Sequence, residues 1–416
     1  MKRGGLRKLF AKLFRRVGGA KGAAAAIALC CIATALPAAG QGEVEAVLRE
    51  VEANNATLSA LREQAEAQKL GNRTGIYPAN PEVEYSYFLG SPSPTGNRTD
   101  ISVRQQLDFP AAYVHRSRIA DAENANVAQA YKSARAALLL GAKQTCIALA
   151  YSNALAREYA ARLQSAEQLA EMYKARLAAG DADVVESNKV QLSLAAVRRE
   201  AAGVATEQAA LRLELRRLNG GKEAPPVGSD YPDSRLPDSF EEWYAQVESA
   251  NPALLYADGQ LEVSRRQVKL AAAEGLPKLS VGYVKESVVG GERFQGVAAG
   301  ISIPLWENKN RTKQARVQVK ASEAALRDAK IRLHSSLQIL YLKACDLRQA
   351  AASYRATLEA CNSELLLKKA LDAGEISLLT YLQEMEFYYA AVSSALATER
   401  DFALAVAEMK AAESVE

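Results

Sequence analysis

The sequence predicts an α+β protein that is mostly helical and is built from one structural unit present twice. Long stretches rich in alanine and charged residues dominate the 416 residues, and such stretches are typical of closely packed helices. In each half of the chain, two short runs of alternating apolar and polar residues interrupt the helical pattern, as β-strands do. The order helix, strand, strand, helix, helix runs through residues 41–218 and again through residues 240–416. This repetition predicts two related structural repeats.

The N-terminal residues 1–40 have the composition of a secretory signal peptide. Residues 1–21 contain eight Lys or Arg and no acidic residue, and a short alanine-rich apolar run follows them. The run ends in Pro37 and small residues, so we expect cleavage near Gly40 or Gln41. An N-terminal membrane anchor is the alternative, but the apolar run is short for a spanning helix.

The net charge changes sign once this segment is set aside. The sequence has 52 Lys and Arg against 48 Asp and Glu, and removal of the eight basic residues leaves 44 against 48. A chain with this balance lacks the basic surplus of nucleic-acid-binding proteins. We therefore predict no nucleic-acid partner.

The sequence offers no constellation for catalysis. Its two histidines, His115 and His334, have no clustered partner residues, so the usual metal-site spacings cannot be built. No Gly-rich phosphate loop, serine elbow or Cys/His pair stands out. We therefore predict that the protein is not an enzyme and has no catalytic residue, metal site or cofactor.

The cysteines do not form a disulfide framework. Cys30 and Cys31 lack the residues expected just before a lipidated cysteine, so no lipid anchor is predicted. Cys146, Cys345 and Cys361 are odd in number and lie in helical patterns, where a small buried residue is expected. A Cys146–Cys345 bond stays open at this point.

Similarity between the halves marks the repeat boundaries. The segment "EANNATLSALREQAEAQK" from Glu52 resembles "ESANPALLYADGQLEVSRRQVK" from Glu248, and each precedes a proline-led alternating run. Residues 219–239 between the halves are rich in Gly, Pro, Ser and Asp. This composition predicts a linker.

Four strands are expected, at about residues 81–90, 100–109, 277–287 and 295–305. Apolar residues alternate with polar or small ones along these runs, so each strand has one apolar face. Runs of roughly 8–11 residues have the length of a tilted strand that crosses an outer membrane. An ordinary half-buried hairpin is the alternative. If the strands do span, four cannot close a barrel, whereas two chains would supply eight and three would supply twelve.

Helices are expected over about residues 44–75, 110–177, 184–218 and 240–274, and a further long helix follows the last strand. At 1.5 Å per residue, the second of these is about 100 Å long and the others are near 50 Å. Two half-length helices can therefore stack beside each full-length helix, with the linker at mid-height. Pro110 and Asn308 are residues expected near the start of the two long helices.

Two similar glycine turns join the long helices to their return helices. The first is "LAAGDADVV", residues 177–185, and the second is "LDAGEISLL", residues 371–379. Each glycine allows a left-handed backbone between antiparallel helices. The polar residues that follow are expected to cap the next helix: Asp181, Asp183, Glu375 and Ser377.

These segments together resemble the TolC-like outer-membrane efflux proteins, the outer-membrane factors of tripartite pumps. The resemblance covers nearly all of the chain after the signal peptide. Its marks are "ANNATL" and "ANPALL" at the start of each half, "QQLDFP" and "ISIPLW" after the hairpins, and the two turn segments. The first hairpin looks most like the heavy-metal and cation efflux branch.

The resemblance implies a membrane protein that forms a homotrimer. Its three chains would share a 12-strand β-barrel in the lipid of the outer membrane, continued by a 12-helix α-barrel through the periplasm. A periplasmic adaptor, the membrane fusion protein, would join its tip to an inner-membrane transporter of the RND type. The channel itself would be a passive exit duct for small molecules or metal ions.

The resemblance also assigns roles to residues near the two turns. The adaptor-docking tips would contain Gly180, Asp181, Asp183, Gly374, Glu375 and Ser377. Family members narrow the entrance with aspartate rings just beyond the second glycine, where this chain has Thr380 and Gln383. Glu384 lies close by, and Glu186 holds the matching place in the first half, so these four residues are the candidates for an entrance constriction.

Two other functions compete with the efflux channel. One is a type I protein secretion channel. The other is a periplasmic coiled-coil adaptor without a pore, which usually carries a single helical hairpin. The two complete copies with strands between their helices favour a channel.

Overall fold

The computed structural model describes residues 39–91, 96–232, 235–288, 290–361 and 364–413. Residues 1–38, and with them almost all of the predicted signal peptide, lie outside this part of the chain. Residues 38–416 form one compact unit.

One four-stranded antiparallel sheet contains strands from both halves of the chain, in the order β1-β2-β3-β4. Pairing between β2 and β3 joins the two halves, with Val103 opposite Tyr283. Strands β1 and β4 form the two edges. The bounds are Glu82–Phe88 for β1, Arg98–Leu107 for β2, Lys278–Val288 for β3 and Arg293–Ser302 for β4.

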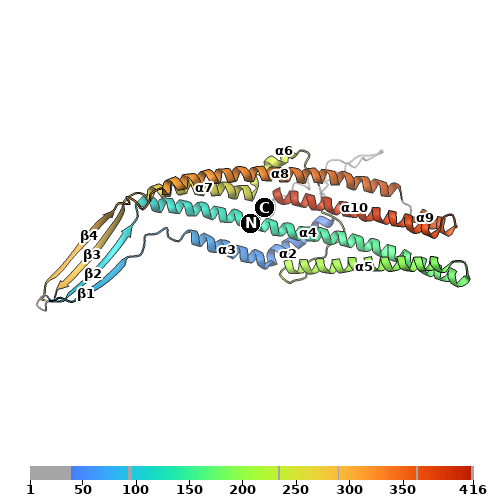
Figure 1. Cartoon of the computed structure of the whole chain (residues 1–416), viewed down its shortest axis with the longest axis horizontal. Coiled ribbons are helices and arrows are strands. Elements are labelled where there is room, and N and C mark those ends of the chain that lie inside the picture. The colour runs from blue at the N-terminus through green and yellow to red at the C-terminus, as the bar shows by residue number, and fades with distance from the viewer. Residues whose placement is uncertain (1–38, 92–95, 233–234, 289, 362–363, 414–416) are drawn as a thin grey trace, which may run out of the picture. The chain divides into compact units, whose positions relative to one another are not determined.

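The helices continue the order of the strands. Helix α3 leads into β1, α4 follows β2, α7 leads into β3 and α8 follows β4, and α3 packs on α4, α4 on α7 and α7 on α8. Their bounds are Ala56–Asn72, Pro110–Ala179, Pro252–Ala273 and Arg311–Ala360. Sheet and helices therefore form one continuous layer in which each strand extends into one helix (Figure 1).

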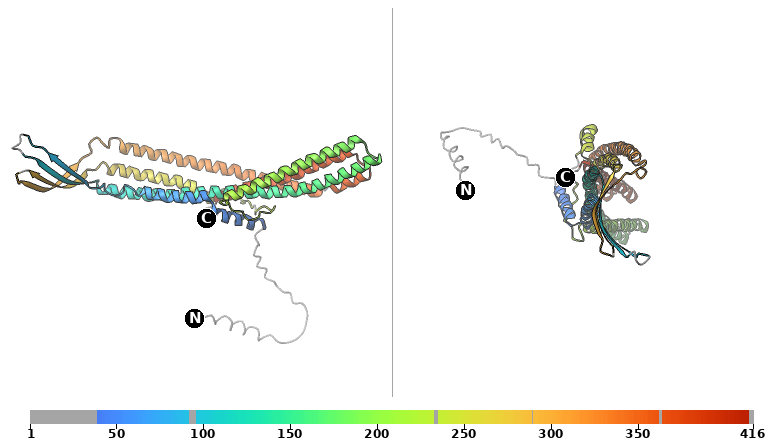
Figure 2. Two further views of the ribbon diagram at one scale, coloured as in Figure 1. Left: turned by 90° about the horizontal axis from the view of Figure 1, so that it is seen from below. Right: turned by 90° about the vertical axis from the view of Figure 1, so that its left-hand side faces the viewer.

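Return helices complete the layer at the end away from the sheet. Helix α5 (Val184–Leu218) packs beside α4, farther from the sheet than α3. Helix α10 (Leu378–Glu413) packs between α4 and α8, farther from the sheet than α7. The 70 residues of α4 give it a length of about 105 Å, and the 35 residues of α5 give about 50 Å. The turns before α5 and α10 thus lie far from the strands (Figures 1 and 2).

Asparagines break two helices that the sequence predicts as continuous. The expected helix over 44–75 is divided into α2 (Ala39–Asn54) and α3, and the expected helix over 240–274 is divided into α6 (Phe240–Ala250) and α7. Asn55 and Asn251 both have extended backbones and accept hydrogen bonds from the first amides of the helix that follows. The breaks are therefore N-caps at equivalent places in the two halves.

The short helices α2 and α6 build two cores at mid-height. Three buried valines of α2 pack against Ala142, Cys146 and Leu149 of α4 and against Leu215 and Leu218 of α5. In the second half, Trp243, Tyr244 and Val247 of α6 pack against Leu337 and Ala344 of α8 and against Ala405 and Met409 of α10. These clusters hold the return helices in register with the long ones.

The long helices of the two halves differ in continuity. Pro110 occupies the first turn of α4, as expected, and α4 runs unbroken to its turn. In the second half α8 ends at Ala360, Cys361 leaves the helical conformation with φ −110° and ψ 44°, and a separate helix α9 spans Glu364–Asp372. The expectation of one very long helix there is wrong.

Candidate functional site: the two turns and the two-faced sheet

The two glycine turns have the same backbone. Gly180 has φ +82° and Gly374 has φ +74°, a left-handed conformation that side chains disfavour. Each glycine amide donates to the carbonyl three residues back, and the next amide, of Asp181 or Glu375, donates to the carbonyl five residues back. Both turns are Schellman C-caps, which satisfy the last carbonyls of α4 and α9.

Two of the four predicted capping residues do cap a helix. The Asp183 carboxylate accepts the Glu186 amide at 2.7 Å, and the Ser377 hydroxyl accepts the Thr380 amide at 3.1 Å. Each bond satisfies one of the free N–H groups at the start of α5 or α10. Helix formation alone accounts for these two side chains.

The other two capping predictions are wrong. Asp181 and Glu375 lie directly after the glycines, and two residues separate each from the start of the next helix. Both side chains are exposed, and neither carboxylate has a hydrogen bond or ion pair with another described residue. Local structure therefore gives no reason for the acids at these two positions.

Apolar packing fixes the turns to their neighbours. Near the first turn, buried residues of α4, α5 and α10 form one cluster: Ala170, Tyr173, Val190, Leu194 and Leu378. Near the second turn, Leu371 of α9 packs with Tyr381 and Met385 of α10. Because Leu378 belongs to the cluster of the first turn, the two turns are held together as one tip.

A buried arginine joins α4 to α10 on the side of this tip that is nearer the sheet. Arg162 is only 6% exposed, and its guanidinium lies over the rings of Tyr159 and Tyr389, with its carbon 4.9 and 4.3 Å from the ring centroids. It also donates to the Tyr389 carbonyl and the Ser393 hydroxyl. Burial, with the nearby Glu364 carboxylate, raises the pKa of Tyr389 and keeps its phenol neutral.

This contact could not be predicted from the sequence. The spacing of Tyr159 and Arg162 is visible as an i, i+3 pair, but Tyr389 is 227 residues further along the chain. No local sequence pattern indicates that α4 and α10 are neighbours near Arg162.

The predicted constriction residues differ in burial, since Thr380, Gln383 and Glu384 of α10 are exposed and Glu186 of α5 is half-buried. Thr380 and Glu384 are exposed and share one stripe of α10, since they are four residues apart. Gln383 lines a groove of about 660 Å³ between α4, α5 and α10, together with Glu386. Glu186 is half-buried on α5, close enough to Tyr173 to help burial raise the pKa of that phenol.

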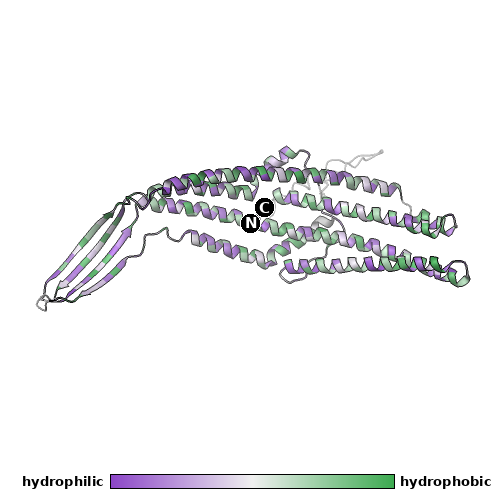
Figure 3. Ribbon diagram, in the orientation of Figure 1, coloured by the Kyte–Doolittle hydropathy of each residue, from purple (hydrophilic) through white to green (hydrophobic). Residues whose placement is uncertain are grey.

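The sheet has one apolar face and one polar face, visible as alternating colours along the strands in Figure 3. Paired residues share a face, and the apolar face contains Val83, Tyr85, Ile101, Val103, Leu279, Val281, Tyr283, Val297 and Ile301. These side chains are 38–85% exposed in the single chain. The polar face contains charged residues, serines and glycines, among them Glu82, Arg104, Ser280, Gly282 and Gly300.

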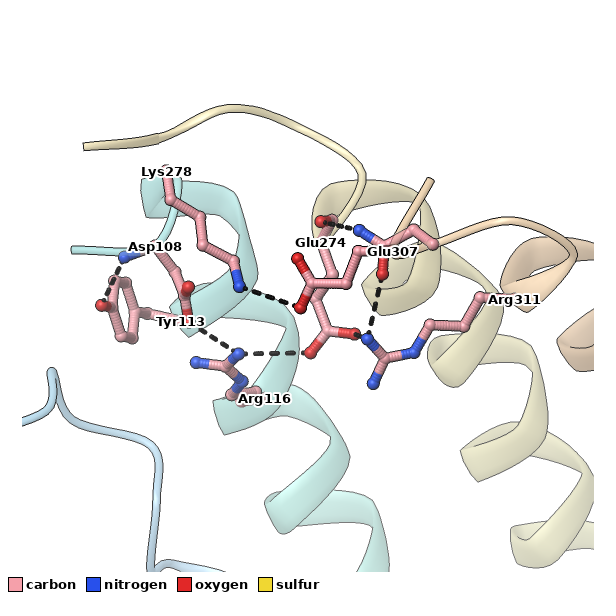
Figure 4. Close-up of polar contacts among 8 residues, drawn as sticks. Asp108, Tyr113, Arg116, Glu274, Lys278, Glu307 and Arg311 are labelled. Atoms are coloured by element: carbon pink, nitrogen blue, oxygen red, sulfur yellow. Dashed lines mark hydrogen bonds and ion pairs between the residues drawn. The ribbon is translucent and has the colours of Figure 1, made fainter. Parts of the chain in front are cut away.

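A polar network ties three strand–helix junctions together (Figure 4). Arg116 of α4 pairs with Asp108 after β2 at 2.8 Å and with Glu274 after α7 at 3.2 Å. Glu274 also pairs with Arg311, the first residue of α8, at 3.0 Å. The sequence predicts Asn308 near this helix start, and its amide instead donates to the Glu274 carbonyl. The network fixes how the helices leave the sheet.

No disulfide joins Cys146, Cys345 and Cys361, the three cysteines among the described residues. Cys146 is buried, Cys345 is half-buried and Cys361 is exposed, so the Cys146–Cys345 bond left open by the sequence is not formed. Burial raises the pKa of the Cys146 thiol to about 12.

None of the helices in the described part of the chain has an apolar stretch that could cross a bilayer. The same residues contain no group of three or more His, Cys, Asp or Glu placed to hold a metal ion.

Comparison with solved structures identifies the fold. The chain superposes on CusC, whose crystal structures concern transmembrane channel formation, with a TM-score of 0.77 and 16% identity over 90% of this chain and 92% of that one. The Campylobacter jejuni outer membrane channel CmeC gives a TM-score of 0.74 and 15% identity over 89% and 85% of the two chains.

A third solved structure agrees. The Neisseria gonorrhoeae outer membrane channel MtrE, in its open state, gives a TM-score of 0.74 and 17% identity over 89% of this chain and 88% of that one. No protein-family model and no curated protein matches the sequence. The chain therefore has the fold of the TolC-like outer-membrane channels, and the resemblance predicted from the sequence is confirmed at the level of fold.

Proposed function

We propose that the protein is the outer-membrane channel subunit of a tripartite efflux pump. In this role it is a passive exit duct for small molecules or metal ions delivered by an inner-membrane transporter. The observation that carries the proposal is the sheet, which has one apolar face, one polar face and two open edges, and which continues strand by strand into the helices. Such a sheet is stable in lipid only when its edges are paired with other chains.

Three chains would close both layers. Four strands from each chain give a barrel of twelve strands, and the four helical columns α3/α5, α4, α7/α10 and α8 give a barrel of twelve helices. Strand β1 of one chain would pair with β4 of the next. The apolar face would then contact lipid and the polar face would line the lumen.

Strand length fits this arrangement. Strands β2, β3 and β4 have 10, 11 and 10 residues, or about 33 Å at 3.3 Å per residue. With a tilt of about 40°, they span about 25 Å, the height of the apolar band of outer-membrane barrels.

The outer helical columns have exposed apolar residues suited to the same association. On α5, Leu192 and Leu213 are 72% and 63% exposed, and on α8, Ile331, Ile339 and Leu342 are at least 60% exposed. Helix α5 packs chiefly on α4 and α8 lies at the opposite side of the layer. Contact between neighbouring chains would bury both sets.

A direct test is membrane fractionation followed by gel electrophoresis without boiling. We expect the protein in the outer-membrane fraction as a detergent-extracted, heat-modifiable trimer that conducts ions in a planar bilayer. A protein that is fully soluble without detergent after signal removal would support the pore-free adaptor instead. Loss of tolerance to small toxic compounds in a deletion strain supports efflux, whereas loss of a secreted protein alone supports type I secretion.

The tip is the proposed docking site for a periplasmic adaptor. Gly180 and Gly374 set its backbone, and Asp181 and Glu375 present exposed carboxylates that no neighbouring residue uses. An adaptor joined there would connect the channel to an RND-type transporter. Charge complementarity would make the two free acids contacts for basic groups on the partner.

Charge reversal tests this docking. Asp181→Lys and Glu375→Lys together should leave the trimer intact, because neither carboxylate has a partner among the described residues, and should reduce adaptor pull-down and resistance. The matched control is Asp183→Ser, which removes a charge from the same turn and keeps a capping oxygen. Unchanged pull-down in the double variant would remove the docking claim.

The entrance is proposed to be lined by Thr380 and Glu384. Thr380, Gln383 and Glu384 are all exposed on α10, and Gln383 also lines the groove between the helices, whereas Glu186 is half-buried on α5. Glu384→Gln should lower the cation preference of the channel. The matched control is Glu386→Gln, which removes an acid from the groove between the helices. Equal effects of the two changes would contradict the assignment.

A further inference from the structure

The polar face of the sheet is unevenly filled. At the end nearest the strand-connecting loops it carries Phe88, Arg98, Asp100, Glu286 and Phe294, which we call the outer cluster. Neighbouring members are direct partners across the strands, so all five side chains lie on one face within a few residues of the loops. The cluster therefore crosses the whole width of the sheet.

The members of the outer cluster contact one another. The Arg98 guanidinium binds Asp100 through two hydrogen bonds of 2.9 and 2.6 Å and pairs with Glu286 at 3.0 Å. It also lies 5.4 Å from the centroid of the Phe88 ring. These contacts hold the long side chains of the outer cluster against one another.

The opposite end of the same face is hollow. A depression of about 430 Å³ lies there, and its lining includes Ser280, Gly282, Ala298 and Gly300. A Cβ atom on Gly282 would come within 2.8 Å of the Val103 carbonyl oxygen, so the strand geometry itself excludes a side chain there. Near the helices the polar face is thus low over the small residues of β3 and β4, and the longer side chains of Glu82, Arg104 and Lys278 border this depression.

The outer cluster has unequal charge and a free aromatic ring. One arginine faces two carboxylates, which gives the outer cluster of each chain a net charge of −1. Phe294 is the direct partner of Glu286 and is 58% exposed, and no cation among the described residues lies over its ring. A carboxylate beside an open aromatic face is a favourable environment for an organic cation.

We infer that the outer cluster forms a second narrow point of the channel, at the loop end of the sheet, which selects for organic cations with apolar groups. This inference rests on the proposed barrel, in which the polar face lines the lumen. Three copies place three net negative charges and six phenylalanine rings around one opening. Arg98 orients the two acids and prevents them from repelling each other.

Salt dependence separates this narrow point from the rest of the lumen. The Debye length is about 10 Å at 0.1 M salt and about 3 Å at 1 M. An acid in a wide part of the lumen influences passing ions at 0.1 M and is screened at 1 M. An acid at a narrow point stays within a few ångströms of every passing ion, so its effect persists at 1 M.

The first experiment measures reversal potentials of the full-length trimer in planar bilayers with potassium chloride gradients. Glu286→Gln should lower the ratio of cation to anion permeability toward one at both salt levels. The matched control is Glu82→Gln, which removes one acid from the hollow end of the same face and should act only at low salt. Each variant is first shown to form the heat-modifiable trimer. If both variants lower the permeability ratio at 0.1 M salt and neither lowers it at 1 M, the inference is overturned.

The second experiment measures block of the potassium current by tetraphenylphosphonium. Phe294→Leu keeps an apolar side chain and removes the aromatic face, and it should weaken block by about two- to fivefold. The conservative change Phe294→Tyr should preserve it. Unchanged block in Phe294→Leu would overturn the aromatic part of the inference.

Failure of the proposed function gives a different result from failure of this inference. If the parent protein forms no conducting trimer, both are overturned. If the parent conducts and the two variants match it, the channel stands and only the outer filter is lost.

Discussion

The duplicated asparagine caps allow a comparison within one chain, because Asn55 and Asn251 have the same backbone and different second contacts. Asn55 accepts the Leu58 amide at 3.0 Å and donates its own amide to the buried Leu218 carbonyl at 2.7 Å. Asn251 accepts the Ala253 and Leu254 amides, and its donor contact to α10 is long, at 3.5 Å. The two residues are 5% and 8% exposed.

These contacts give different costs for the same substitution. Loss of a helix N-cap costs about 1 kcal/mol, so Asn251→Ala should lower the free energy of unfolding by about that amount. Asn55→Ala also leaves a buried carbonyl without its donor, which adds about 1–3 kcal/mol. We therefore expect a total of about 2–4 kcal/mol for Asn55→Ala.

Aspartate separates the two contributions. Asn251→Asp keeps the capping oxygen and should change the free energy of unfolding by less than about 0.5 kcal/mol. Asn55→Asp keeps the cap but loses the donor to Leu218, so it should cost at least about 1 kcal/mol. The assay is guanidinium unfolding of the detergent-solubilised trimer, followed by the helical circular dichroism signal. Equal costs at the two sites, or a neutral Asn55→Asp, would refute this reasoning.

Three further predictions concern other parts of the chain. Gly180→Ala should lower the free energy of unfolding by about 1 kcal/mol, measured by the same unfolding assay, because φ is +82° although a Cβ would meet no atom within 4 Å. A thiol reagent followed by mass spectrometry should label Cys361 in the folded protein and Cys146 only after unfolding, because Cys146 is buried and its pKa is raised to about 12; rapid labelling of Cys146 in the folded state would contradict this. The hydrogen bond from Arg135 lowers the pKa of Glu52, so its stabilisation is present above the usual glutamate pKa and is lost as pH falls through the lowered value. The difference in unfolding free energy between the parent and Glu52→Gln should thus be constant above about pH 5 and shrink below about pH 4, and a difference that grows toward acid would exclude this role.

Features with a local cause could be predicted from the sequence. Strands were expected from alternation with a period of two, and β1 to β4 lie where that alternation occurs. The positive φ of Gly180 and Gly374 follows from the same kind of reasoning, since a glycine between two helical patterns is the usual C-cap. The end of α5 at Leu218 likewise precedes the glycines that begin the linker.

Features that depend on distant contacts could not be predicted. The helical pattern continues across Asn55, and the contact that makes the break specific is to Leu218, 163 residues away. The contact between Arg162 and Tyr389 likewise joins residues that lie far apart in the sequence. The predicted capping by Asp181 and Glu375 is wrong because the number of residues between each glycine and the next N-cap depends on the path of the turn, which composition does not determine.

The central claim is that several copies of this chain close one barrel through β1 and β4. Within one chain these strands are three strand spacings apart, about 14 Å, which exceeds the reach of a disulfide, about 7 Å between Cα atoms. A disulfide between them can therefore form only between chains. The measurement uses a background without the native cysteines, with Glu84→Cys on β1 combined in turn with a cysteine at Gly296, Ala298 or Gly300 on β4.

The within-chain control pairs cysteines at Ser102 and Val284, which are direct partners on β2 and β3. After oxidation in membranes, the account predicts that at least one β1–β4 pair gives covalent dimers and trimers on a denaturing, non-reducing gel, with no larger species. The control pair should remain monomeric. Monomers alone for every β1–β4 pair, or ladders that extend beyond three chains, would contradict the account.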